Sequence, residues 1–168
     1  MSEYYFAYGS NMNADRMIAR GLRFERALSG RIHGLGLAFN KRCALQSHRA
    51  YANVIYAPDS CVEGVLYQLR GADEIFKMDP FEGSPRLYSR DVYWVDTAEG
   101  PIAAWVYVAN RAMISEGIQP ERWYLDHLLA GKVYLSAEYY QTLLQIACCD
   151  DELKPDNYAT MAALAGEA

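Results

Sequence analysis

The chain has 168 residues and a formal net charge of −5, with 52% hydrophobic and 22% charged residues. This length suits one domain with a core of its own, and the composition excludes wholesale disorder. The acidic balance gives no general attraction to nucleic acid or to anionic membranes, and no apolar run reaches the roughly 20 residues of a membrane span. Residues 1–150 are predicted to form the domain, and residues 151–168 a weakly packed tail.

The N-terminal residues and the cysteines predict a cytoplasmic protein. Residues 1–4 lack the basic start and apolar run of a secretory signal. The cysteines lack metal-ligand spacing and are expected to be reduced thiols: Cys43, Cys61, Cys148 and Cys149. The histidines lack such spacing too, so no metal site is predicted: His33, His48 and His127.

The N-terminal segment predicts a strand, a turn and a helix. An aromatic run over residues 4–8 is typical of a strand that is buried on both faces. Gly9 begins the turn that follows. Asn11 or Asn13 is predicted to cap the next helix, which ends near Arg20.

More strands are predicted before residue 70, at residues 23–29, 35–40, 50–57 and 62–69. Gly30 and Gly34 are expected to bend the chain between the first two of these strands, and Pro58-Asp59 is expected to end the third. A short helix is predicted over residues 71–78.

The second half of the chain combines a hairpin with helices. Residues 87–96 and 102–108 are predicted to pair through a turn at Thr97–Pro101. Pro120 is expected in the first turn of one helix, and Ser136 is expected to cap the last one. Early strands and late helices predict an α+β fold, with a small barrel-like or mixed sheet and flanking helices.

The most informative segment is Tyr8-Gly9-Ser10-Asn11, between the buried strand and the helix. Such a turn leaves several backbone N–H groups convergent, and these can bind a carboxylate or stabilise an oxyanion. The segment lacks the second glycine and the lysine of phosphate-binding loops, and Ser10 lacks the surroundings of a hydrolase nucleophile. On these residues alone, an ordinary strand–turn–helix with a polar cap is the commoner interpretation.

The second informative residue is Glu82, which lies between Phe81 and Gly83 and is bracketed by two prolines. It is predicted on a rigid connection between a helix and a strand. A carboxylate among apolar neighbours can exchange protons near neutral pH, which makes Glu82 a candidate general acid–base. Taken alone, a glutamate in this setting is more often a solvent-facing loop residue. Asp79 is interpreted as a helix-terminal group rather than a second catalytic carboxylate.

Together, these two segments resemble the γ-glutamylcyclotransferase family, which has the AIG2-like or BtrG-like fold. The strand at residues 63–67 and the helices at 120–131 and 136–144 extend the resemblance to roughly residues 4–147. The resemblance implies a cavity for a γ-glutamyl group with one essential glutamate, which is Glu82 by matched position. It assigns the substrate-binding loop to Tyr8, Gly9, Ser10 and Asn11. It assigns three aromatic cavity positions to Tyr88, Tyr107 and Tyr124. On composition alone, any of the 14 tyrosines is more often a core residue.

The resemblance also implies an activity. The enzyme would act on a small-molecule γ-glutamyl substrate, release 5-oxoproline and a free amine or amino acid, and need no metal or cofactor. We expect a monomer or a homodimer. The match is weakest over residues 20–50, the wall where the leaving group would be recognised. The alternative from another class is a non-catalytic small-molecule-binding or interaction protein on the same fold.

Overall fold

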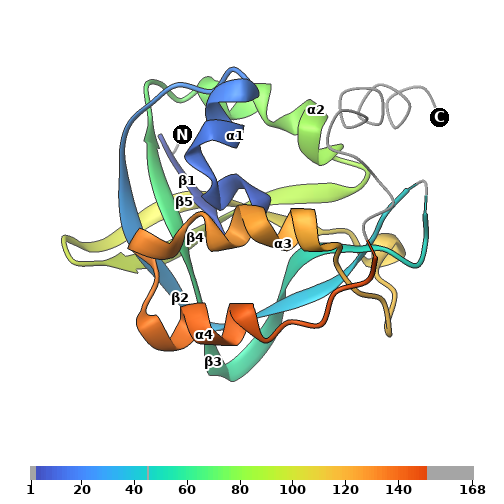
Figure 1. The fold of residues 1–168 in the computed structure, drawn as a ribbon. Coiled ribbons are helices and arrows are strands. Elements are labelled where there is room, and N and C mark those ends of the chain that lie inside the picture. The colour runs from blue at the N-terminus through green and yellow to red at the C-terminus, as the bar shows by residue number, and fades with distance from the viewer. Residues whose placement is uncertain (1–2, 45, 151–168) are drawn as a thin grey trace.

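The structure, a computed structural model, describes residues 3–44 and 46–150, so the predicted tail at residues 151–168 lies outside the described residues. The described chain forms a closed barrel with helices packed on it (Figure 1). The strand order around the barrel is β1-β3-β2-β4-β5. The predicted α+β fold with a barrel-like sheet is confirmed. No helix among the described residues is long and apolar enough to cross a membrane.

The strands of the barrel are β1 (Tyr4–Ala7), β2 (Phe24–Arg42), β3 (Ala50–Leu69), β4 (Tyr88–Thr97) and β5 (Gly100–Ala109). The α-helices are α1 (Ala14–Ala19), α2 (Asp79–Glu82), α3 (Arg122–Leu129) and α4 (Ala137–Leu144). Short 3-10 turns are η1 (Ser10–Met12), η2 (Glu74–Lys77), η3 (Arg111–Met113) and η4 (Lys132–Tyr134). In Figure 1, α3 and α4 run next to each other across one side of the barrel, while α1 and α2 lie at its upper end.

β1 is buried on both faces, as its aromatic sequence predicts. It pairs antiparallel with β3 and by a parallel bridge, from Tyr5 to Trp105, with β5. The Phe6 ring packs closely on Gly64, because a Cβ added to that glycine would lie only 2.9 Å from the ring. Tyr5 packs on the rings of Tyr67 and Tyr107. The lack of polar alternation therefore reflects a strand with neighbours on both sides.

β2 is one continuous strand, and the predicted break between residues 29 and 35 is wrong. A Cβ on Gly30 would come within 2.6 Å of Val95 and 3.2 Å of Phe6, so this glycine makes room for packing. Gly34 has a φ of +81°, in a register shift between His33 and Leu35. Both glycines are thus accommodated inside the strand because pairing with β3 resumes beyond them.

β3 is also continuous, and the predicted end at Pro58-Asp59 is wrong. His33 pairs with Cys61 and Leu35 pairs with Tyr56, so residues 57–60 stand opposite Gly34 alone. Pro58 falls in this bulged stretch, where no regular ladder needs the N–H that proline lacks.

The local helix signals were mostly informative. The Asn13 side chain caps α1 by accepting from the N–H of Asp15 at 3.0 Å, and Ser136 caps α4. Pro120, expected in the first turn of α3, instead lies before its N-cap residue Glu121. The helix predicted over residues 71–78 is η2, followed by a separate turn, α2.

The hairpin at the end of the sheet is confirmed and is tighter than predicted. β4 and β5 pair from Tyr88 with Ala109 to Thr97 with Gly100. Only residues 98–99 therefore form the turn, and both strands return their outer ends to the same edge of the barrel.

Candidate active site

The loop after β1 lies tightly against its neighbours. Tyr8, Ser10 and Asn11 are all buried, and a Cβ on Gly9 would come within 3.2 Å of both Ala52 and the Tyr124 hydroxyl. The glycine therefore permits a close approach of backbone to β3 and α3. Within the described residues, the backbone N–H groups of residues 9–11 donate no recorded hydrogen bond. Binding of an anionic group by these donors stays a prediction.

Glu82 is brought to this loop by the turn α2. It is the last residue of that turn, and Gly83 follows in the left-handed conformation with a φ of +62°. Its side chain is 15% exposed. Oε1 accepts from Nδ2 of Asn11 at 2.9 Å, although the two residues are 71 positions apart, and it lies 3.4 Å from NH1 of Arg20. The predicted rigid connection is therefore helical, and its carboxylate contacts the predicted loop.

Asn11 links several groups through its side chain. Its Nδ2 also donates to the Tyr5 hydroxyl at 2.8 Å, and its Oδ1 accepts from NH1 of Arg20 at 2.9 Å. Its backbone carbonyl accepts from the Tyr67 hydroxyl at 2.9 Å. Sequence reasoning treated Asn11 as a loop or cap residue and missed Arg20, which lies just beyond α1 with its guanidinium over the Phe81 ring. The only sequence signal for Arg20 is its position as a charged residue at the end of a short predicted helix.

Two of the predicted tyrosines contact the same residue of β3. The Tyr88 hydroxyl donates to the carbonyl of Ala52 at 2.7 Å, and the Tyr124 hydroxyl accepts from the N–H of Ala52 at 3.0 Å. Tyr88 begins β4 and Tyr124 belongs to α3. These hydroxyls therefore join three elements at one point of the wall.

The third predicted tyrosine contacts Asp79. The Tyr107 hydroxyl donates to Oδ1 of Asp79 at 2.6 Å, and Nε of Arg90 lies 3.1 Å from the same oxygen. Burial and the hydrogen bond to Asp79 raise the pKa of Tyr107, so its hydroxyl stays protonated. The Tyr8 hydroxyl donates to the backbone carbonyl of Tyr107. Burial and the charge of Glu82 raise the pKa of Tyr8 as well. Asp79 is the first residue of α2, which agrees with its interpretation as a helix-terminal group.

Every predicted site residue lines one pocket, which we call the inner pocket. Its lining residues are Tyr5, Tyr8, Gly9, Ser10, Asn11, Ala52, Glu82, Tyr88, Tyr107 and Tyr124. The structure therefore brings together residues from the β1 loop, α2, β4, β5 and α3. Sequence reasoning missed Tyr5 and Ala52, whose roles depend on which elements meet.

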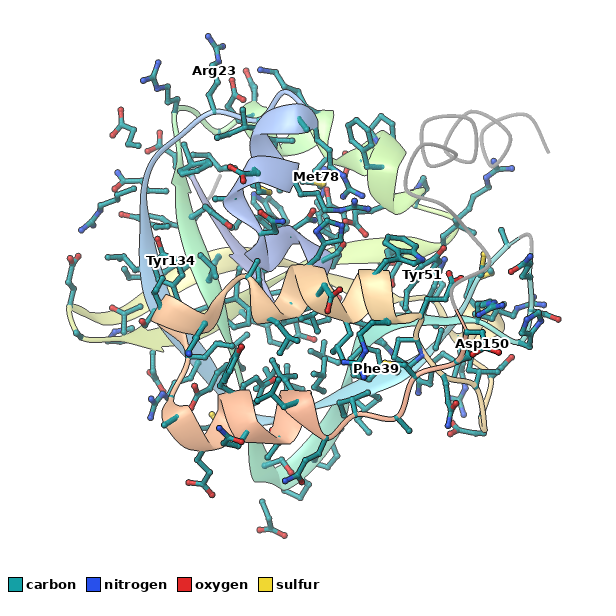
Figure 2. The ribbon with its side chains drawn as sticks, viewed as in Figure 1. Arg23, Phe39, Tyr51, Met78, Tyr134 and Asp150 are labelled. Atoms are coloured by element: carbon teal, nitrogen blue, oxygen red, sulfur yellow. The ribbon has the colours of Figure 1, made fainter. Side chains whose placement is uncertain are left out.

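An adjoining outer pocket shares Ser10, Glu82, Tyr88 and Tyr124 with the inner one. Its other lining residues are Arg20, Lys41, Cys43, Ala44, Tyr51, Pro80, Phe81, Gly83 and Leu87. Figure 2 shows Tyr51 beside α3, whose Tyr124 ring lies 5.0 Å from the Tyr51 ring between centroids. The two pockets together form the cleft, and Glu82 lies where they meet.

Lys41 is the unexpected residue of the outer pocket. It lies on β2 and is 4% exposed. Burial lowers the pKa of Lys41, and the charge of Glu82 opposes that shift. The sequence offered no signal for it, because residues 20–50 carry no motif.

The described residues outside the cleft line a further cavity but form no candidate metal site. Another cavity, of about 380 Å³, lies beside Arg31, Glu63 and Asp96, and none of the predicted residues lines it. Among the described residues, no group of three His, Cys, Asp or Glu side chains could hold a metal ion.

Comparison with known proteins agrees with the geometry. The sequence profile of the gamma-glutamyl cyclotransferase, AIG2-like family matches residues 5–125. A solved structure named gamma-glutamyl cyclotransferase has a TM-score of 0.76 at 21% identity, with 98% of each chain covered. An uncharacterised protein from Homo sapiens has a TM-score of 0.77 at 24% identity, covering 95% of this chain and 97% of that one. A γ-glutamyl cyclotransferase specific to glutathione from yeast reaches 0.54 at 12% identity, covering 98% and 95%. No curated protein matches the sequence.

The solved structures show that the fold is shared. The family profile covers most of the chain and spans both the β1 loop and Glu82. The chain therefore belongs to the gamma-glutamyl cyclotransferase, AIG2-like family.

Proposed function

We propose that the protein is a γ-glutamylcyclotransferase, which converts a small γ-glutamyl compound into 5-oxoproline and a free amine or amino acid. One observation carries this proposal. Glu82, whose carboxylate is held by Asn11 and Arg20, lines the same pocket as Gly9, Ser10 and Asn11, whose backbone N–H groups would serve as the donors. A proton-transferring group and a set of anion-binding donors are the two parts that this reaction needs.

The substrate supplies its own nucleophile. The α-amine of a γ-glutamyl group can attack the γ-carbonyl and close a five-membered lactam, so no side chain has to form a covalent intermediate. Holding the chain in the curled conformation supplies an effective molarity of roughly 10⁵–10⁸ M. The enclosed inner pocket, with tyrosine rings on several sides, is suited to that task.

Glu82 would carry the proton. Its carboxylate takes a proton from the α-ammonium group, the amine adds to the γ-carbonyl, and a tetrahedral oxyanion forms. When the bond to the leaving nitrogen breaks, the Glu82 carboxyl group gives the proton to the departing amine and returns to the carboxylate. The attacking nitrogen loses its second proton to solvent as the lactam forms. Among the described residues, the side-chain contacts of Glu82 with Asn11 and Arg20 both reach Oε1, so Oε2 is the oxygen proposed for proton exchange.

The N–H groups of residues 9–11 would bind negative charge. They can stabilise the oxyanion or hold the α-carboxylate of the γ-glutamyl group, and both roles use the same donors. The tyrosine hydroxyls stay protonated because burial raises the pKa of Tyr5, Tyr8 and Tyr107. They therefore add no negative charge to the pocket. The protons of Tyr8 and Tyr107 are already donated to the Tyr107 carbonyl and to Asp79, whereas the Tyr5 hydroxyl accepts from Asn11 and keeps its proton for a ligand.

The test is an assay for product. The protein is incubated with a panel of γ-glutamyl amino acids and γ-glutamyl amines, and 5-oxoproline is measured by mass spectrometry. Release from at least one compound by the wild-type protein supports the proposal. Silence across a broad panel, from protein with a cooperative thermal transition, would contradict it and favour a ligand-binding protein without catalysis.

A further inference from the structure

Lys41 is a buried cation whose ammonium group packs against aromatic rings. Its ammonium group lies 5.0 Å from the centre of the Tyr51 ring and 5.3 Å from that of Tyr88. In the part of the chain that the structure describes, Nζ makes no hydrogen bond and no ion pair. Aromatic faces offset part of the cost of burying a positive charge, but they do not replace an anion. The arrangement favours an anionic ligand at this point.

The other cation of the cleft is already engaged. Arg20 donates to Asn11 at 2.9 Å, lies 3.4 Å from Glu82 and stacks on the Phe81 ring. Its charge is therefore used to hold the Glu82 carboxylate. Lys41 is the cation of the outer pocket that remains for a ligand.

The position of Lys41 decides which part of a substrate it can meet. Lys41 lines the outer pocket and not the inner one, and Glu82 lies at their junction. On the proposed function, the γ-glutamyl group occupies the inner pocket and its amide bond lies at Glu82. The leaving group then extends into the outer pocket, towards the ammonium group between the two rings.

We propose that Lys41 binds a carboxylate of the leaving group, so that the substrates are γ-glutamyl amino acids or peptides rather than γ-glutamyl amines. This proposal rests on the proposed function and names its substrate class. The carboxylate would supply the anion that Lys41 lacks, and its approach would favour the charged ammonium group. The Tyr51 and Tyr88 rings would shield that ion pair from water and strengthen it.

A pair of substrates isolates the carboxylate. γ-Glutamylalanine and γ-glutamylethylamide differ only in the carboxylate that the leaving alanine carries and ethylamine lacks. For the wild-type protein we expect kcat/KM to favour γ-glutamylalanine by about 10- to 100-fold, the range for a hydrogen bond to a charged group. In Lys41→Met this ratio should fall to near one, and in Lys41→Arg part of it should remain.

The matched control is Arg42→Met. It removes the same charge from the neighbouring residue of β2, which does not line either pocket. It should keep the wild-type ratio. Lys41→Met should also unfold at a higher temperature than the wild type, because it removes an unpaired buried charge. Lys41→Gln serves as the second neutral variant if the methionine variant does not fold.

Each other outcome overturns the proposal. The proposal fails if the wild-type kcat/KM ratio of the two substrates is near one, or if Lys41→Met keeps the wild-type ratio. It also fails if Lys41→Met lowers kcat/KM equally for both substrates, because Lys41 would then act on the γ-glutamyl group. If no compound yields 5-oxoproline, the proposed function fails, and calorimetric binding of the same two compounds decides the role of Lys41. Equal affinities or no binding would overturn it, whereas the same ratio, lost in Lys41→Met, would support it.

Discussion

The inner and outer pockets differ in how their charged groups are satisfied. In the inner one, Glu82 has partners within the protein, and the tyrosine wall is held by Asp79 and by the backbone of Ala52. In the outer one, the Lys41 ammonium group packs against two aromatic rings and has no hydrogen bond or ion pair with the described residues. On the proposed function, the protein itself positions the groups that act on the reacting atoms, whereas the cation proposed to select the leaving group awaits its ligand.

The largest effect is expected when the carboxylate of the inner pocket, Glu82, is replaced by an amide. Glu82→Gln keeps the size of the side chain but cannot carry a proton, so turnover should fall about 100- to 10,000-fold. The thermal midpoint should change little. Glu138→Gln, at an exposed position of α4, is the control. Turnover near the wild-type value in Glu82→Gln would remove this residue from the mechanism.

A second change tests whether the loop acts through its backbone. Gly9→Val places a branched side chain where even a Cβ would come within 3.2 Å of Ala52 and Tyr124. Displacing the loop should lower kcat/KM by about 100-fold or more. Ser10→Ala should have a much smaller effect, because the hydroxyl has no assigned role. The reverse pattern, an inactive Ser10→Ala with a tolerated Gly9→Val, would instead indicate a serine nucleophile.

Removing the tyrosine hydroxyls tests whether the wall of the inner pocket takes part in catalysis. At least one of Tyr88→Phe, Tyr107→Phe and Tyr124→Phe should lower kcat/KM by about tenfold, which corresponds to about 1.4 kcal/mol of transition-state stabilisation. Each change keeps the ring and removes one hydrogen bond to the wall. Tyr56→Phe, on a side chain that is 81% exposed, is the control. If all three variants match the wild type, these tyrosines only fill the core.

The smallest expected effect concerns stability rather than rate. Burial and the charges of Arg16 and Arg20 lower the pKa of His127 from 6.5 to about 4. Between these values the unfolded state binds the proton and the folded state does not, so the free energy of unfolding should fall as the pH drops from 6.5 to 4. His127→Gln should flatten this part of the profile, measured by urea unfolding. The exposed His48→Gln should not, and equal profiles in all three proteins would argue against the shift.

The parts of the fold that sequence predicts are those with local signals. The aromatic run before Gly9, the caps Asn13 and Ser136, and the hairpin turn each depend on neighbours a few residues away. Gly30, Gly34 and Pro58 suggested breaks because their local preferences are unfavourable in strands. Pairing along most of β2 and β3 overrides those preferences, and that pairing is not visible in a single segment.

The candidate site divides in the same way. The loop residues and Glu82 belong to two short motifs, and their resemblance to a family located them. Arg20 and Lys41 carry no motif, because each depends on contacts with segments remote in the chain. Asn11 was predicted in the loop and lines the inner pocket, but the hydrogen bond from its side chain to Glu82 spans 71 residues and could come only from the structure.

The position of β1 in the barrel has a consequence for folding. β2 pairs with β3, and β4 with β5, between segments close in sequence, whereas β1 must insert between β3 and β5. Contacts across such a separation form late, so we expect both hairpins to form before β1 docks and brings Gly9 against Tyr124. Pulse-labelled hydrogen exchange would then show protected amides in β4 and β5 before those of β1, and the opposite order would refute this. A chain emerging from the ribosome would remain without its cleft until α3 had been synthesised, although the loop after β1 is made well before it.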